Sequence, residues 1–174
     1  DGDEDLYLVG GGYEFDISSR SYQDRLFTNE RGRFFPSKDA LPDFASSGSC
    51  VRAADFDRDG DLDLFVGGRV HPSFYPLPVS SYLLINNGQG KFSMGTDSHA
   101  SPLDRIGLIS DALWTDYDND GWVDLLLAGE WMPLSILKNT SGRLNTLIPL
   151  LKDEAVGWWN SLAAGDFDMD GDMD

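Results

Sequence analysis

The residues of this sequence that could do chemistry are aspartates, which recur in short clusters instead of being spread along the chain. The 30 acidic residues outnumber the 13 basic residues and give a formal net charge of −17. Carboxylates packed this densely repel one another, so bound cations are the simplest way to stabilise them. The clusters comprise Asp1, Asp3 and Asp5; Asp55, Asp57, Asp59, Asp61 and Asp63; Asp116, Asp118, Asp120 and Asp124; and Asp166, Asp168, Asp170, Asp172 and Asp174.

The three complete clusters share one pattern, Asp-[Phe/Tyr]-Asp-x-Asp-Gly-x-x-Asp. The side chains at loop positions 1, 3, 5 and 9 offer carboxylates that can converge on one point, and the glycine at position 6 permits a sharp turn. The carbonyl group at position 7 can add one more oxygen. About six to eight hard oxygen ligands are typical of calcium, whereas magnesium demands tighter octahedral geometry. The pattern therefore predicts loops that bind calcium in a structural role.

These loops differ from an EF-hand, although their first residues match one. An EF-hand needs a glutamate at position 12 and a helix on each side. Position 12 is Val66 in one repeat and Leu127 in another, and each lies in an apolar run typical of a strand. The sequence therefore excludes the EF-hand.

The segments around the loops also repeat, and they predict strands. An apolar run that ends in glycine is typical of a strand buried on both faces, and such runs occupy residues 5–10, 62–68 and 123–129. Each run is followed by a predicted hairpin, at residues 26–34, 83–92 and 136–144. We expect asparagine and glycine to form the bends because both tolerate a positive φ. Short stretches with small residues precede the complete loops and supply a fourth strand, and no segment has convincing helical periodicity.

Four antiparallel strands that repeat about every 40–60 residues predict an all-β fold, a β-propeller of four-stranded blades. The chain holds about three blades' worth of strands, so we expect it to be part of a larger propeller. Flanking blades or a second copy would then cover the apolar faces at its two ends. The repeats of this partial propeller domain span residues 1–48, 49–107, 108–158 and the start of the next repeat, 159–174.

The composition excludes several classes of function. The acidity disfavours binding to nucleic acid or to an anionic membrane, and no apolar run is long enough to span a membrane. The single cysteine, Cys50, excludes a disulfide framework, and we expect it to be a buried residue. The motifs of serine hydrolases, zinc proteases and P-loop enzymes are absent. We therefore expect a protein that is not an enzyme.

The loop between two strands resembles the FG-GAP/VCBS repeat, the unit of the integrin α-subunit β-propeller. Of the two, the sequence more closely resembles bacterial FG-GAP-like repeat proteins related to cartilage acidic protein, which often carry an ASPIC/UnbV domain. The phrases that carry it are Gly67-Gly-Arg-Val70, Asp111-Ala-Leu-Trp-Thr-Asp116 and Trp159-Asn-Ser-Leu-Ala-Ala-Gly-Asp166. The resemblance implies a secreted or envelope-exposed protein that acts in adhesion or ligand binding.

The resemblance also implies which residues hold calcium. In that family, positions 1, 3, 5 and 9 of the loop bind calcium through side chains and position 7 through its carbonyl group. The implied ligands are Asp55, Asp57, Asp59, Asp61 and Asp63; Asp116, Asp118, Asp120, Trp122 and Asp124; and Asp166, Asp168, Asp170, Asp172 and Asp174. The cluster Asp1–Asp5 matches only half a loop.

Three functions are compatible with this sequence. The first is a calcium-stabilised binding or adhesion module for a protein or glycan, with no nucleic-acid partner. The second is the propeller portion of a polysaccharide-degrading enzyme whose active site lies elsewhere, and the third is a scaffold. For the first, the best candidate contact residues are Phe74, Tyr75, Trp131, Trp158 and Trp159.

Overall fold

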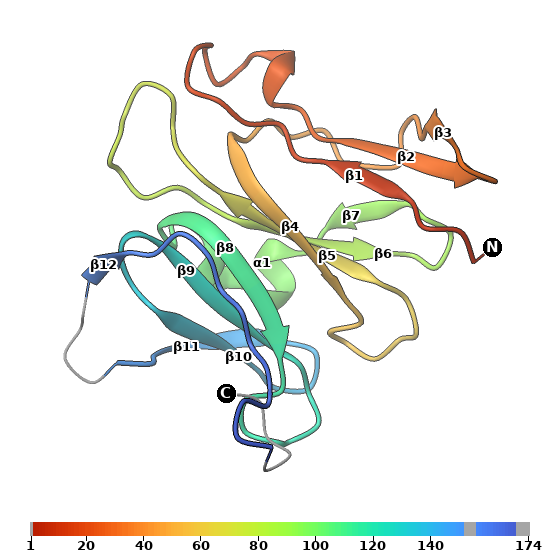
Figure 1. Ribbon diagram of the computed structural model, residues 1–174. Coiled ribbons are helices and arrows are strands. Elements are labelled where there is room, and N and C mark those ends of the chain that lie inside the picture. Colours follow the sequence, from red (N-terminus) through yellow and green to blue (C-terminus); the bar gives the residue numbers. More distant parts are fainter. Residues whose placement is uncertain (1, 152–155, 170–174) are drawn as a thin grey trace.

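The computed structural model describes residues 2–151 and 156–169 and consists of three antiparallel sheets (Figure 1). The first sheet has the order β1-β2-β3 and the second has the order β4-β5-β6-β7. Their strands are β1 (Leu6–Leu8), β2 (Arg25–Glu30) and β3 (Arg33–Pro36), then β4 (Gly48–Ala54), β5 (Asp63–Gly68), β6 (Tyr82–Asn86) and β7 (Phe92–Met94). Within both sheets, each strand pairs with the next along the chain.

The third sheet repeats this meander and adds one strand. Strands β8 to β11 pair in sequence order, and β12 pairs with the end of the long strand β9. The strands are β8 (Leu108–Thr115), β9 (Asp124–Pro133), β10 (Ser135–Asn139), β11 (Leu144–Pro149) and β12 (Val156–Trp158). The helices are short: η1 (Arg20–Tyr22), α1 (Thr96–His99) and η2 (Ser101–Leu103). Strand accounts for 41% of the chain and helix for 6%, which confirms the all-β prediction and agrees with propeller blades.

The three predicted hairpins are present as β2–β3, β6–β7 and β10–β11. The expected reason for asparagine at these bends is wrong, because the residues with positive φ are others, such as Arg31, Gly32 and Gly142. The asparagines act through their side chains instead. The Oδ1 atoms of Asn29, Asn86 and Asn139 accept hydrogen bonds from the backbone N–H groups of the turn.

A second bond connects each asparagine to the end of its aspartate cluster. The backbone N–H of Asn86 donates to Asp63, and that of Asn139 donates to Asp124, at 2.8 and 2.6 Å. The side-chain amide of Asn139 also donates to the carbonyl oxygens of Val123 and Phe56. Phe56 belongs to the preceding repeat, so this asparagine joins two repeats.

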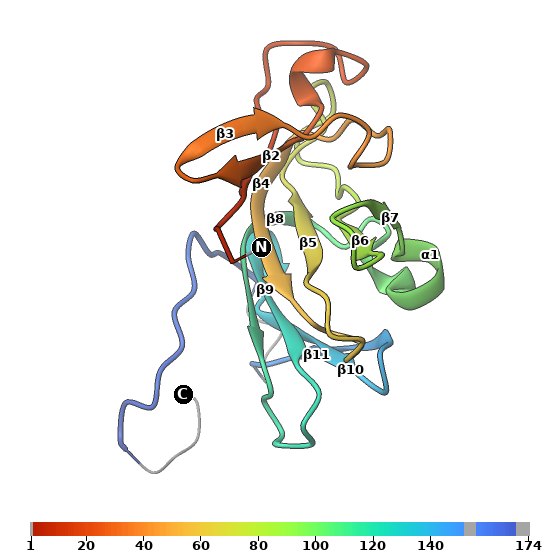
Figure 2. The same ribbon diagram turned by 90° about the vertical axis from the view of Figure 1, so that its right-hand side faces the viewer.

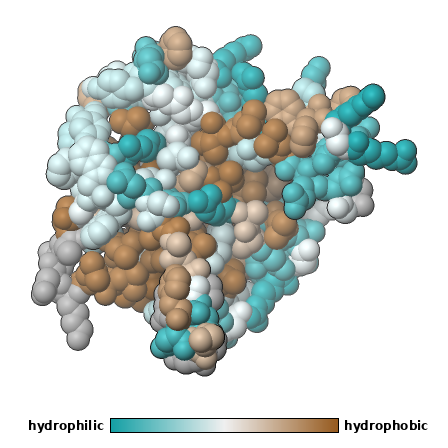
Figure 3. All heavy atoms as spheres, viewed as in Figure 1, coloured by the Kyte–Doolittle hydropathy of each residue, from teal (hydrophilic) through white to brown (hydrophobic). Residues whose placement is uncertain are grey.

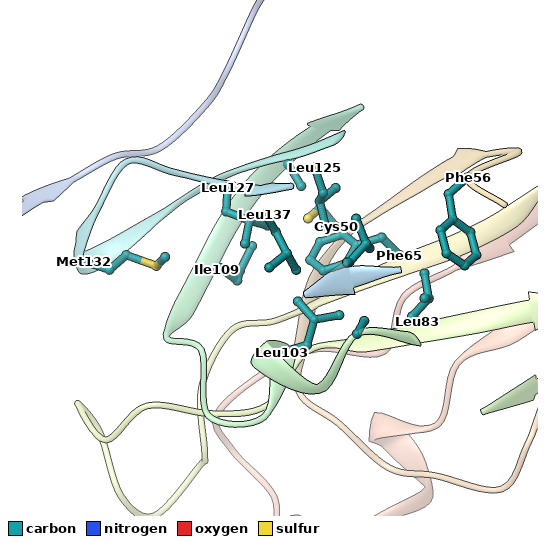
Figure 4. Packing of buried hydrophobic residues seen from close by; sticks show 13 residues of the cluster. Cys50, Phe56, Phe65, Leu83, Leu103, Ile109, Leu125, Leu127, Met132 and Leu137 are labelled. Carbon is teal, nitrogen blue, oxygen red and sulfur yellow. The ribbon is translucent and has the colours of Figure 1, made fainter. Parts of the chain in front are cut away.

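The main core lies between the second and third sheets (Figure 4). Phe65 of β5, Ile109 of β8 and Leu127 of β9 are fully buried there. Cys50 packs in the same cluster, and burial raises the pKa of its thiol. The prediction that Cys50 is a buried residue is therefore confirmed.

Strands β4 and β8 lie side by side (Figures 1 and 2) and are joined by polar groups that bridge the two sheets. The Arg52 guanidinium donates to the carbonyl oxygen of Ala112 and forms an ion pair with Asp111. Asp111 also accepts from the backbone N–H of Leu162 and the hydroxyl of Ser161, in the segment after β12. Burial opposes ionisation, but these hydrogen bonds and Arg52 lower the pKa of Asp111. One carboxylate therefore connects three successive repeats.

We expect Asn139→Ala to reduce the free energy of unfolding by about 3 kcal/mol, because it leaves buried backbone groups without partners. Asn139 has no exposed surface, and its side chain serves both its own turn and the preceding repeat. Urea denaturation of the two proteins measures the difference.

The matched control is Asn145→Ala on β11, because Asn145 is exposed. That change should alter the free energy of unfolding by less than about 0.5 kcal/mol. Equal effects of the two substitutions would show that the Asn139 network contributes nothing specific.

Candidate metal centres

The first three aspartates of each described complete cluster come together in space. One carboxylate oxygen from each of Asp55, Asp57 and Asp59 lies within 4.8 Å of the others. Asp116, Asp118 and Asp120 form the same arrangement in the next repeat. The predicted convergence of loop positions 1, 3 and 5 is thus present in both loops.

The backbone of the loop holds this arrangement. The glycines at position 6, Gly60 and Gly121, have φ values of 95° and 89°, a region that glycine enters without steric cost. The N–H of Gly60 donates to Asp55 at 3.2 Å, and that of Gly121 donates to Asp116 at 2.8 Å. The loops are therefore shaped by their own backbone.

Position 4 also has a positive φ, which the sequence reasoning missed. Arg58, Asn119 and Met169 have φ values of 63°, 56° and 62°. The common value shows that the third loop begins with the same turn as the other two. Asparagine tolerates a positive φ, so an asparagine at position 4 could have predicted this turn. It occurs there only in the second loop.

The aspartates at position 9, Asp63 and Asp124, are fully buried. One oxygen of each accepts the backbone N–H of an asparagine. Among the residues that the structure describes, however, Oδ2 of Asp63 and Oδ1 of Asp55 have no hydrogen-bond partner. Burial raises the pKa of Asp63 to about 7, and the charges of the other loop aspartates also raise it. Burial likewise raises the pKa of Asp124.

Two buried carboxylate oxygens without partners are costly, and a cation would satisfy them. All the donor atoms gathered in the first loop are hard carboxylate oxygens, which suit calcium better than a softer metal. The residues present therefore fit calcium.

The side chains at loop position 7, Asp61 and Trp122, contact residues outside the group of converging carboxylates. The ring of Trp122 packs under the guanidinium of Arg58, with 4.4 Å between the guanidinium carbon and the ring centroid. Asp61 approaches Gly88 in the next hairpin. Aspartate and tryptophan can thus share this position, and the part played by their carbonyl groups stays a prediction.

A positively charged side chain that the sequence did not predict contacts the second loop. The Lys138 ammonium group on β10 forms ion pairs with Asp118 and, at 3.4 Å, with Asp120. The hydrogen bond to Asp118 is the main reason why the pKa of Lys138 is raised. The first loop has no equivalent lysine, because the matching residue before Asn86 is Ile85. The two loops therefore differ in charge compensation.

The remaining predicted ligands are only partly described. Asp166 and Asp168 are described and exposed, whereas Asp170, Asp172 and Asp174 lie outside the described residues.

In the half loop, Asp1 also lies outside the described residues, but the rest repeats the second half of a complete loop. Gly2 has a φ of 97°, and Asp5 accepts the N–H of Asn29 at 2.8 Å. Asp3 accepts the N–H of Arg31 at 2.9 Å.

Comparison with known families identifies the repeat. The family described as FG-GAP-like repeat matches residues 1–66 and 116–174. No curated protein and no solved structure matches this chain. Across residues 2–151 and 156–169, no helix is long and apolar enough to cross a membrane.

We expect Lys138→Met to increase the calcium affinity of the second loop by about three- to tenfold. The ammonium group competes with a metal ion for the same carboxylates, and its removal leaves their charge to the ion. Isothermal titration with calcium measures this, in an Asp57→Asn background that weakens binding at the first loop.

The control for this titration is Lys38→Met, which removes an exposed lysine that follows β3. That variant should bind calcium as the background protein does. An unchanged or weaker affinity in Lys138→Met would contradict the competition.

Proposed function

Because this chain belongs to the FG-GAP-like repeat family, we propose that it is a calcium-stabilised part of a β-propeller that acts outside the cytoplasm. In this proposal the propeller is a binding or adhesion module for a protein or glycan and catalyses no reaction. The observation that carries it is the convergence of three carboxylates in each of two loops, with partnerless buried oxygens in the first.

Electrostatics supports a bound cation. Two unit charges about 4 Å apart repel each other by about 1–4 kcal/mol at effective dielectric constants between those of water and a protein surface. The first loop contains three such pairs of carboxylates, all within 4.8 Å. Together they repel by about 3–12 kcal/mol, which is comparable with the stability of a typical domain, about 5–15 kcal/mol, so a divalent ion would be a major stabilising component.

Calcium in the first loop would also stiffen the neighbouring repeat. Gly142, in the β10–β11 turn, lies against Asp57, and a Cβ atom there would approach that of Asp57 to 3.1 Å. The amide of Asn139 reaches the carbonyl group of Phe56, and Arg58 stacks on Trp122. An ion that orders Asp55–Asp63 would therefore order part of the next blade. A rigid scaffold of this kind suits a module whose loops bind a ligand.

The supply of calcium supports the proposed extracellular location. Modules outside the cell use sites with dissociation constants of about 10⁻⁴–10⁻³ M, which are filled there but empty in the cytosol. We expect fractionation of cells that produce the full-length protein to recover it in the secreted or envelope fraction. A cytosolic pool would contradict the proposal.

Removal of calcium should lower the melting temperature. At a calcium concentration about 100 times the dissociation constant, one site contributes about 2.7 kcal/mol. Differential scanning calorimetry in excess chelator should therefore show a lower transition temperature, and added calcium should restore it, while magnesium should restore less.

The variants Asp57→Asn and Asp118→Asn separate the two loops, because each removes one converging carboxylate. Each should reduce the calcium-dependent shift of the melting temperature, and the double variant should leave only the part that the third predicted loop contributes. The control is Asp97→Asn, an exposed aspartate of α1. A melting curve that chelator leaves unchanged would refute the metal centres.

A further inference from the structure

A pocket of about 600 Å³ lies between the three sheets, lined by residues from all three repeats. Tyr13 comes from the β1–β2 connection, Arg69 and Tyr75 come from the β5–β6 connection, and Glu130 and Trp158 come from β9 and β12. Figure 1 shows the β5–β6 connection and β12 on the same side of the molecule. We call this cavity the aromatic pocket.

A buried ion pair forms one wall of the aromatic pocket. The Glu130 side chain is 2% exposed, and one of its oxygens pairs with the Arg69 guanidinium, whose side chain is 38% exposed. The other oxygen accepts a hydrogen bond from the Tyr75 hydroxyl at 3.2 Å. The glutamate is thus neutralised, while Arg69 still presents donors to the pocket.

Aromatic rings form the rest of the wall and the rim. Tyr13, Tyr75 and Trp158 are each about half exposed. Trp131 does not line the pocket but contacts two of these residues: its indole N–H donates to the Tyr75 hydroxyl at 2.8 Å, and its ring lies 5.2 Å from that of Trp158. Trp131 has a φ of 57°, a conformation that is unfavourable for a bulky residue. Strain of this kind is tolerated where the surrounding structure fixes a side chain for a purpose.

The framework of the pocket is fixed by hydrogen bonds within the first repeat and between the first and second repeats. The Ser47 hydroxyl donates to the carbonyl oxygen of Gly12 and accepts its N–H, and the Ser47 carbonyl accepts the N–H of Arg69. The connections that carry Tyr13 and Arg69 are therefore held by one buried serine. A pocket formed before the ligand arrives binds at a lower entropic cost.

Apolar and polar side chains alternate in patches on the face of the molecule shown in Figure 3. Figure 3 shows apolar side chains gathered beside β1 and over the sheet that contains β9, with more polar side chains between them. A ligand of the aromatic pocket must therefore combine apolar faces with polar edges.

We propose that the aromatic pocket binds a neutral carbohydrate, with a pyranose ring stacked on the exposed aromatic rings and its hydroxyl groups bonded to Arg69. The pyranose ring has apolar C–H faces that pack on Tyr and Trp, and its equatorial hydroxyls match the donors of a guanidinium group. This inference rests on the proposed function and names the ligand class of its binding module.

Charge disfavours an anionic ligand, because it would meet a protein of net charge −17 and the Glu14 carboxylate at the pocket. Within the pocket, Arg69 already neutralises Glu130. The pocket itself has no large net charge of either sign, which suits an uncharged polar ligand.

Two of the candidate aromatic residues do not contribute. The Trp159 indole donates to the backbone carbonyl of Met132, and Phe74 packs on His71 with 4.8 Å between ring centroids. Neither lines the aromatic pocket. The sequence identified Tyr75, Trp131 and Trp158 as candidates, but it contained no sign of Arg69 or Glu130.

The test is an array of neutral and acidic oligosaccharides, probed with the calcium-loaded chain, followed by tryptophan fluorescence titration with the neutral glycans that bind. Tyr13→Ala and Trp158→Ala should each weaken binding by about tenfold, because each removes one stacking surface. Tyr13 is 56% exposed, so this variant should melt close to the parent protein. The control is Phe167→Ala, which removes an exposed ring outside the pocket and should leave binding unchanged.

Three results would overturn the inference. In the first, the protein binds no glycan at all. In the second, it binds acidic glycans alone. In the third, it binds neutral glycans, and both pocket variants bind them as well as the parent protein does. The calorimetry in chelator is independent of these results, so loss of the carbohydrate site leaves the calcium-stabilised module standing. Conversely, the protein could melt at the same temperature with and without calcium, while both pocket variants lose glycan binding. That result would refute the calcium sites and support the carbohydrate site.

Discussion

The mutual repulsion of clustered carboxylates is the constraint on which the rest of this structure depends. Asp55, Asp57 and Asp59 converge although each charge opposes the others, and the buried oxygens of Asp55 and Asp63 lack partners. Such an arrangement is costly unless a counter-charge compensates it or a carboxylate binds a proton. In the second loop Lys138 supplies a counter-charge from the neighbouring strand, whereas the first loop has no equivalent lysine, so in the proposed function the first loop depends more on calcium.

The repeats are coupled at both edges of their sheets. Near the aspartate loops, Asn139 donates to the backbone of the preceding repeat, and Arg58 stacks on Trp122 of the following one. Along the inner strands, Arg52 and Asp111 join β4 to β8 and to the segment after β12. Each repeat therefore completes hydrogen bonds of its neighbours, which is how a repeat array becomes cooperative. The core between the second and third sheets adds the apolar part of this coupling.

The coupling leaves the connections at the other ends of the strands available for binding. There the strands β5 and β9 lead into the aromatic pocket, whose polar wall is the Arg69–Glu130 pair. In the proposed function, the array separates stability from recognition. Charged groups that order the blades lie in one set of loops, and aromatic groups suited to a ligand lie in another.

The sequence by itself determined the all-β class, the repeat, the hairpins and the convergence of aspartates in the loops. These features depend on residues close together in the chain, such as Gly60 beside Asp55–Asp59, so a local pattern is enough to predict them. Only the tertiary structure revealed that the bend asparagines act through side-chain hydrogen bonds and that Lys138 enters the second loop. It alone united Arg69, Tyr75 and Glu130, because Tyr75 and Glu130 lie 55 residues apart and become neighbours only when successive sheets pack together. No pattern within one repeat reports a contact between repeats.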